Sequence, residues 1–284
     1  MAIKYWDGGA GTGVISTAAN WDGDALPANG DTIIFSDNSA NITGDLTSKT
    51  DLNMVVGNQW TGNFGSSSTP LEMDLVSLEY SGTGSEAYID LNTSTVTNVD
   101  VQDTGFGSAA LVLGGTVTIT KLRVTGGRGT IKSSGARTVT TVECFGAKQS
   151  TLDLTAAAVT GTTLKMDSGT VKISGNYTNI EVSGGSLYIS GTPTGISTVD
   201  IYGGDVLWNV SGATAAITSR LSVYDGSFDA TESTASVSTI TGAEVYEDGL
   251  INEQNGIENI TWSGGITTHG GRIIFDSGRV LTIT

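Results

Sequence analysis

From about Met54 to the last residue, apolar and polar positions alternate in short stretches that are separated by small-residue turns. Strict alternation is found at 117–119, 171–173, 180–182, 187–189 and 199–201. Alternation with a period of two residues is typical of a β-strand that buries one face. No stretch keeps a helical period over several turns. The pattern therefore predicts an all-β chain.

The turns recur at a regular interval. The glycines that mark the first turn of each phrase are Gly84, Gly107, Gly127, Gly146, Gly169, Gly185, Gly204, Gly226, Gly249, Gly265 and Gly278. Their mean spacing of about 19 to 20 residues lies in the range of solenoid repeats, and it predicts about 11 coils. A solenoid offers side faces for binding rather than one central pocket.

Two all-β architectures compete for this pattern. An antiparallel sandwich requires hairpins and long Greek-key connections. A parallel β-helix instead stacks equivalent strands of successive coils about 4.8 Å apart. The turns occupy matching positions in each period, long polar loops are absent, and small residues dominate the corners. These features favour a single-stranded parallel β-helix, and we expect it to be right-handed because parallel crossovers nearly always are.

The first fifty residues lack the regular alternation of the rest of the chain. They are rich in loops and contain two tryptophans and an early proline, Pro27. We therefore divide the chain into a cap or anchor region at 1–50 and a β-solenoid at 51–284, because a solenoid end needs a cover for its unpaired edge. The candidate cap or anchor residues are Tyr5, Trp6, Trp21 and Phe35. At the other end, 278–284 reads as a strand without a cap, which favours oligomerisation or a continuing chain.

Charge narrows the choice of partners. The formal net charge of −16 and the pI near 4.2 argue against nucleic acid and anionic membranes, since phosphate binding needs clustered Lys and Arg. The thin basic group of Lys121, Arg123, Arg128, Lys132 and Arg137 reads as ordinary solvated surface.

The sequence shows no targeting signal and no sign of a reactive cysteine. The opening residues lack the apolar run of a signal peptide, and no stretch is long enough to insert into a membrane. We thus expect a protein that is made in the host cytoplasm and ends in a virion, or one that leaves the cell by a route other than an N-terminal secretory signal. Cys144 alternates with Val142 on a predicted strand and has no histidine nearby in sequence, so a buried structural thiol is expected rather than a nucleophile.

A more specific pattern opens the chain. It consists of Tyr5-Trp6, Gly8, Gly9, Gly11, Gly13, Ser16-Thr17, Asn20-Trp21, Pro27, Gly30-Asp31, Ile33 and Phe35. This order resembles the opening of a group of bacteriophage structural proteins, and it is similar to the coil-starting repeat of bacterial autotransporter passengers. The resemblance covers about an eighth of the chain.

The phage resemblance fits better, because the pattern begins at Met1 without a leader, whereas an autotransporter needs a secretory signal and a membrane barrel. The resemblance implies a virion component, such as a head decoration, a head fibre or a tail-associated spike, and no catalytic residues.

Chemistry on a side face is the alternative. Tailspike-like polysaccharide-degrading enzymes place carboxylates on one face of a β-helix, and glycoside hydrolysis needs a carboxylate pair. Asp205, Asp225 and Asp248 hold similar places near the first turn, with Asp167 before them. Aspartate is also a favoured turn residue beside glycine. We therefore predict no enzyme, and no catalytic, cofactor or metal residues; neither the acidic group around Glu247 nor the sole histidine, His269, forms a recognised motif.

Surface aromatic residues are the remaining candidates for binding. Tyr202, Trp208, Tyr224 and Tyr246 recur along the later coils, where aligned rings can stack on sugars or pack on a protein. Filling of the core and packing of rings between successive coils explain these positions equally well. We expect a structural and adhesive virion protein that binds other capsid or tail proteins, forms a homo-oligomer with a trimer favoured, and takes a host-surface glycan as a candidate partner. The alternatives are a tailspike-like enzyme and a secreted adhesin passenger domain.

Overall fold

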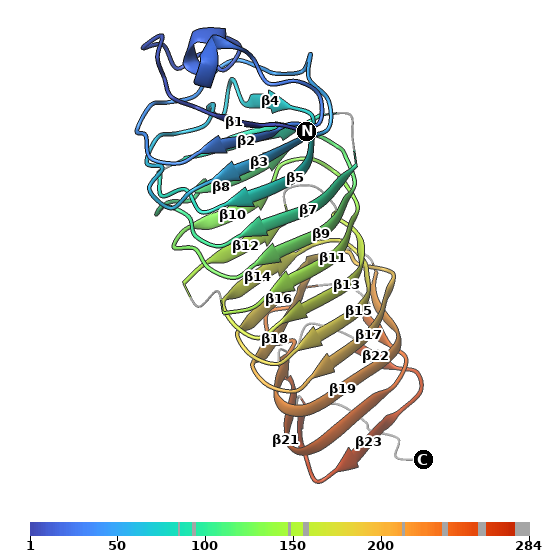
Figure 1. The fold of residues 1–284 in the computed structure, drawn as a ribbon. Coiled ribbons are helices and arrows are strands. Elements are labelled where there is room, and N and C mark those ends of the chain that lie inside the picture. The colour runs from blue at the N-terminus through green and yellow to red at the C-terminus, as the bar shows by residue number, and fades with distance from the viewer. Residues whose placement is uncertain are drawn as a thin grey trace. The chain divides into compact units, whose positions relative to one another are not determined.

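The computed structural model describes residues 1–84, 86–92, 95–146, 149–155, 159–211, 214–234, 238–254 and 260–275. The chain divides into two compact units, one formed by 1–141 with 149–157 and the other by 142–148 with 158–284. Both units are built from parallel β-strands that repeat along the sequence, in about ten turns (Figure 1). The predicted all-β parallel β-helix is confirmed, with about one coil fewer than the 11 expected.

The first unit contains two short 3-10 turns, η1 (Ala18–Asn20) and η2 (Asp22–Asp24), between its first two strands. Its strands are β1 (Ile3–Tyr5), β2 (Thr32–Phe35), β3 (Leu52–Val56), β4 (Leu71–Met73), β5 (Leu75–Tyr80), β6 (Tyr88–Leu91), β7 (Val96–Val101), β8 (Leu111–Gly114), β9 (Ile119–Val124), β10 (Thr130–Ser133) and β12 (Thr151–Leu154). Strand β11 (Val139–Cys144) spans the boundary between the units.

The second unit continues with the same kind of strand. Its strands are β13 (Gly161–Met166), β14 (Thr170–Ile173), β15 (Tyr177–Val182), β16 (Ser186–Gly191), β17 (Ile196–Ile201), β18 (Asp205–Val210), β19 (Ala215–Asp229), β20 (Ser238–Ile240), β21 (Ala243–Glu253), β22 (Ile260–Trp262), β23 (Ile266–His269) and β24 (Arg272–Phe275).

Strands pair in parallel with the strand one coil later, which for most strands is the second one along the chain. In the first unit, β1, β2, β3, β5, β7 and β9 form one such series, and β4, β6, β8, β10 and β12 form another. In the second unit, β13, β15, β17, β19, β21 and β23 form one series, while β14, β16, β18 and the end of β19 form another. This pairing excludes the hairpin-based sandwich.

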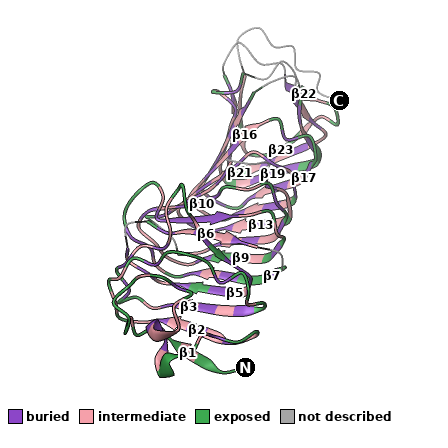
Figure 2. Cartoon of the chain, turned by 90° about the horizontal axis from the view of Figure 1, so that it is seen from above, coloured by how far each residue is buried: buried purple, intermediate pink, exposed green. Residues whose placement is uncertain are grey.

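Registered pairing turns the sequence alternation into buried columns. In the second unit, Leu164, Ile180, Val199 and Leu221 stand in line on successive strands and are all fully buried. Figure 2 shows buried positions alternating with intermediate and exposed ones along the strands. Because burial of apolar surface contributes about 25 cal/mol per Å2, each coil gains stability chiefly by covering its neighbour.

The parallel stacking runs through the predicted boundary at residue 50. Strand β2, inside the predicted cap, pairs with β1 on one side and with β3 on the other, in the register Ile33 to Met54. The N-terminal region thus contributes strands to the parallel stack, with longer loops between them.

One corner of the second unit is a column of glycines. Gly185, Gly204 and Gly226 all have a left-handed backbone, with φ of +79°, +78° and +85°. A Cβ atom on Gly204 would lie 2.5 Å from the carbonyl oxygen of Gly185, and one on Gly226 would collide with the carbonyl oxygen of Gly204. Both the torsion and the close approach require glycine here. The turn signal found in the sequence is therefore confirmed at these positions, while Gly278 lies outside the described residues.

Alanine substitutions separate the two requirements. Gly265 also has a left-handed backbone, with φ of +83°, but a Cβ atom added to it would have no heavy atom within 4 Å. We expect Gly265→Ala to cost about 1 kcal/mol from the backbone torsion alone. Gly204→Ala should cost about 1–3 kcal/mol more, because the preceding coil must move. Urea unfolding of both variants measures the difference, and equal losses would contradict the stacked corner.

Candidate functional site

The predicted cap residues form a buried aromatic cluster, with one exception. Phe35 lies at its centre, with ring centroids 5.8 Å from Trp6, 5.7 Å from Trp21 and 5.2 Å from Trp60. The indole of Trp21 also donates a hydrogen bond to the carbonyl of Ile15, at 2.8 Å. Trp6, Trp21 and Phe35 are core residues, so they hold the first coil together and do not touch an external partner.

Tyr5 is the member of the predicted set that remains outside, 46% exposed. Met1, Ile3 and Val14 are exposed as well. We call these four residues, all within the first fourteen of the chain, the N-terminal apolar group; they are most of the exposed large apolar side chains of the described residues, and Ile3 and Tyr5 share one face of β1. An apolar surface of this kind is suited to contact with another protein.

A side chain from the η2 turn covers the outer edge of β1. The backbone N–H of Tyr5 donates to Asp22 Oδ1 at 3.0 Å, and Lys4 Nζ donates to the Asp22 carbonyl at 2.9 Å. Unpaired strand edges invite pairing with other chains, and covering them with a loop blocks this. Asp22 therefore acts as a partial cap, a role that the sequence alone did not reveal.

Asn20, next to Trp21 in the opening pattern, organises the glycine-rich loop. Its side-chain oxygen accepts from the N–H of Ala10, and its amide donates to Thr12 Oγ1 and to the carbonyl of Val14, at 3.0 to 3.1 Å. A buried amide with three bonds fixes the loop that it crosses. The Asn20-Trp21 pair of the opening pattern is thus explained by its hydrogen bonds within the first coil.

Asp31, in the Gly-Asp element of the same pattern, ties the N-terminus to the loop. Its carboxylate accepts hydrogen bonds from the N–H of Ala2 at 2.5 Å and of Ala28 at 2.9 Å. These two backbone bonds lower the pKa of Asp31 from its ordinary value, and they outweigh the opposing effect of burial.

The predicted surface aromatics are in part a stacked ladder. The rings of Tyr202 and Tyr224 lie 4.8 Å apart at an interplanar angle of 6°, and those of Tyr224 and Tyr246 lie 4.5 Å apart at 17°. His269 extends the series, 4.6 Å from Tyr246. We call Tyr202, Tyr224, Tyr246 and His269 the aromatic ladder. Stacking of His269 was not foreseen, although its spacing from Tyr246 fits the repeat.

Trp208 does not belong to this surface. It is fully buried, packs 5.8 Å from Phe228, and donates from its indole to Ser238 Oγ at 3.3 Å. The alternation along β18 places Trp208 inward, in register with the buried Ile189. Its prediction as a surface-binding residue is therefore wrong.

Charged pairs flank the ladder on its own series of strands. Lys165 Nζ lies 2.8 Å from Glu181 Oε2, and the Arg220 guanidinium contacts both carboxylate oxygens of Asp200 at 2.8 and 3.0 Å. Glu181 and Asp200 are register partners on adjacent strands. Burial raises the pKa of Tyr202, and the charge of Asp200 raises it further. The ladder thus borders on a row of fixed hydrogen-bonding groups.

The acidic column considered for catalysis is incomplete. Asp225 and Asp248 are register partners on β19 and β21, but Asp205 stands opposite Ser227 and accepts its hydroxyl at 2.7 Å. Asp167 accepts from the backbone N–H of Gly146 and from the hydroxyl of Ser168. These contacts match the turn role of aspartate. Of the four aspartates considered for catalysis, only Asp225 and Asp248 are register partners.

Cys144 is buried, as the sequence predicted. Burial raises the pKa of its thiol to about 12, with a smaller contribution from Asp167. A thiol in this state is protonated at neutral pH and is a poor nucleophile.

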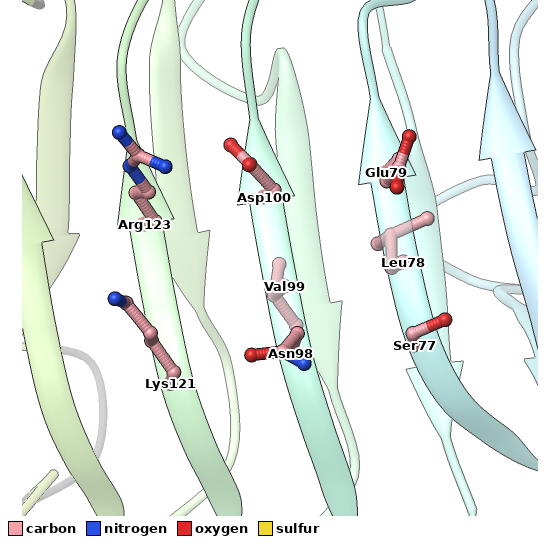
Figure 3. Close-up of a pocket in the computed structure, with 8 residues that line it drawn as sticks. All are labelled: Ser77, Leu78, Glu79, Asn98, Val99, Asp100, Lys121 and Arg123. Atoms are coloured by element: carbon pink, nitrogen blue, oxygen red, sulfur yellow. The ribbon is translucent and has the colours of Figure 1, made fainter.

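A polar hollow of about 300 Å3 lies on the outer face of β5, β7 and β9 in the first unit (Figure 3). Two rows of register partners line it, Ser77 with Asn98 and Lys121, and Glu79 with Asp100 and Arg123. The side chains in each row point to the same side of the sheet. This hollow is lined by two acids and two bases, and it has no aromatic side chain among its lining residues.

Basic residues of the first unit are dispersed rather than gathered in a stripe. Lys121 and Arg123 line the hollow, whereas Arg128 lies 4.8 Å over the ring of Phe106 and pairs with Asp103. Arg137 is buried and donates from Nη2 to the carbonyl of Leu113 at 3.0 Å, so its prediction as solvated surface is wrong. Burial lowers the pKa of Arg137 to about 10.

Comparison of the chain with protein-family models, with curated proteins and with solved structures finds no match. Among the described residues, no group of three His, Cys, Asp or Glu side chains is placed to hold a metal ion. The described part of the chain also contains no helix with the length and apolarity needed to cross a membrane.

Acid should loosen the first coil through Asp31. Because its folded-state pKa is depressed, its stabilising effect is present above the ordinary value of 3.8 and is lost as the pH falls through the lower folded-state pKa. At pH 7, Asp31→Ala should cost about 2 kcal/mol. Denaturant unfolding between pH 7 and pH 2 should show a smaller acid-induced loss in this variant than in the original chain. Parallel pH profiles for both chains would contradict the assignment.

Proposed function

We propose that this chain is a structural and adhesive component of a bacteriophage particle, in the manner of a capsid decoration, a head fibre or a tail-associated spike. The observation that carries the proposal is the N-terminal pattern, from Tyr5-Trp6 to Phe35, which resembles the opening of phage structural proteins. Its elements Trp6, Asn20, Trp21 and Asp31 have defined structural roles in the first coil. These contacts give the elements of the pattern a structural reason to occur together, which supports the resemblance.

Two further features support a structural role. Parallel strands with buried columns give stiff side faces that can be displayed on a particle. The net charge of −16 favours solubility and disfavours binding to nucleic acid. The N-terminal apolar group offers a contact surface for another virion protein, and a homo-oligomer, with a trimer favoured, is part of the proposal.

Analysis of purified particles tests this function. We expect mass spectrometry of density-purified particles from a culture that expresses the chain to find it at a fixed ratio to the major capsid protein. Cryo-EM should place it at symmetric positions, in groups of three if the trimer is correct. Expression of the chain together with its absence from intact particles would contradict the proposal.

An enzymatic role is tested on the one remaining acidic pair. A structural protein should leave host polysaccharide at its original length, as measured by size-exclusion chromatography after incubation with the purified chain. Depolymerisation that disappears in Asp225→Asn and in Asp248→Asn, but persists in Asp205→Asn, would replace our proposal with a tailspike-like enzyme.

A further inference from the structure

The aromatic ladder has one ring face that the chain leaves uncovered. Tyr224 and Tyr246 each stack between two neighbours, so both of their faces are occupied. Tyr202 stacks on Tyr224 alone among the described residues. Ile201 pairs with Val182 of the preceding coil, so the position in that coil equivalent to Tyr202 is Ser183, which has no ring. No aromatic ring of the described residues therefore covers the opposite face of Tyr202, and its side chain is 50% exposed.

We propose that the open face of Tyr202 binds one neutral sugar ring, with Lys165, Glu181, Asp200 and Arg220 holding its hydroxyl groups. This inference rests on the adhesive role proposed above and names the class of ligand. The negative face of an aromatic ring attracts the partly positive C–H groups of a sugar. A stacked ring with a few fixed polar groups around it is the usual composition of a small-ligand site.

The ladder preorganises the platform. Stacking on Tyr224 at an interplanar angle of 6° fixes the plane of the Tyr202 ring, and Tyr224 is itself held by Tyr246. The free ring therefore loses little conformational freedom on binding, which favours affinity. Tyr224 and Tyr246 act as positioning residues, since their faces are already covered.

The polar groups beside the ring are held in place and keep bonding capacity. Asp200 is fixed by two bonds from Arg220, and Glu181 by one bond from Lys165. A carboxylate has about four acceptor sites and an ammonium group has three donors, so each pair retains free positions. Sugar hydroxyls donate and accept, and they match such mixed groups.

Charge selects a neutral ligand. The two ion pairs are each neutral, the carboxylates of Glu143 and Glu244 lie near their bases, and the whole chain carries a charge of −16. An anionic polysaccharide gains nothing from the local pairs and is repelled by the wider field. A neutral sugar meets no such barrier, and its binding should depend little on salt.

A protein partner fits this place less well. Tyr202 is the only large apolar side chain classed as exposed among the described residues of the second unit. The core of a protein interface requires several adjacent apolar residues, whereas one ring matches the size of one sugar unit. Such a single contact should be weak, with a dissociation constant on the order of 1 mM, and should gain strength from many copies on a particle.

NMR titration of the full chain tests the inference. The probes are the methyl glycosides of glucose, galactose and N-acetylglucosamine, with the methyl glycoside of glucuronic acid as the anionic comparison. We expect saturation transfer to at least one neutral glycoside and little to the anionic one. Tyr202→Ala should weaken binding at least tenfold, and Tyr202→Phe should retain it.

Matched variants control for folding and position. Phe106→Ala removes an exposed ring in the other unit, 66% exposed in the original chain, and should leave sugar binding unchanged. Tyr224→Ala should weaken binding less than Tyr202→Ala, because it loosens the ring without removing it. Amide spectra that superimpose away from the substitution show that each variant is folded.

Four results would overturn the inference. The first is no saturation transfer to any of the neutral glycosides at a concentration 20 times the expected dissociation constant of about 1 mM. The second is unchanged sugar binding in Tyr202→Ala, and the third is tighter binding of the anionic glycoside than of the neutral ones. The fourth is binding of a purified virion protein at Tyr202 when no sugar binds there. Failure of the virion proposal is detected separately, because the Tyr202→Ala chain should still be incorporated into particles. Sugar binding by a chain that is absent from particles would support the site while rejecting the virion role.

Discussion

In-register pairing of parallel strands is the constraint on which the rest of this structure depends. Once Val199 stands over Ile180 and Leu221 over Val199, the apolar positions form continuous columns inside. The same register places Tyr224 on Tyr202 outside, at a ring distance of 4.8 Å that is close to the strand spacing. Core and surface are therefore two results of one repeat, and a shift by one residue would exchange them.

The fold was largely predictable because its signals are local and repeated. Alternation at 180–182 and 199–201 predicts strands, and glycines at the corners predict turns with a left-handed backbone. Strand β1 escaped detection because it has three residues and precedes a glycine-rich loop, whereas Ile33, Ile34 and Phe35 of β2 read as a short apolar strand. Their pairing depends on contacts between residues about 29 positions apart, a longer interval than the later repeat. A regular period therefore locates regular coils and misses the enlarged one.

Surface features were less predictable than the core. The aromatic period correctly marked Tyr202, Tyr224 and Tyr246 but also included Trp208, which lies on the inward side of its strand. A shift of two positions in the turn decides which acids meet, so Asp225 aligns with Asp248 while Asp205 aligns with Ser227. The polar hollow was missed because its rows are visible only when β5, β7 and β9 are set side by side.

The glycine corner also limits how a gene for this chain can change length. Gly204 fits beneath the carbonyl of Gly185, and Gly226 beneath that of Gly204, so each coil is matched to the one before it. An insertion of a few residues within a strand would displace every later glycine from its carbonyl and turn apolar side chains outward. Duplication or deletion of an entire coil preserves both relations. Such proteins should therefore diversify in steps of one repeat, with smaller insertions confined to the loops.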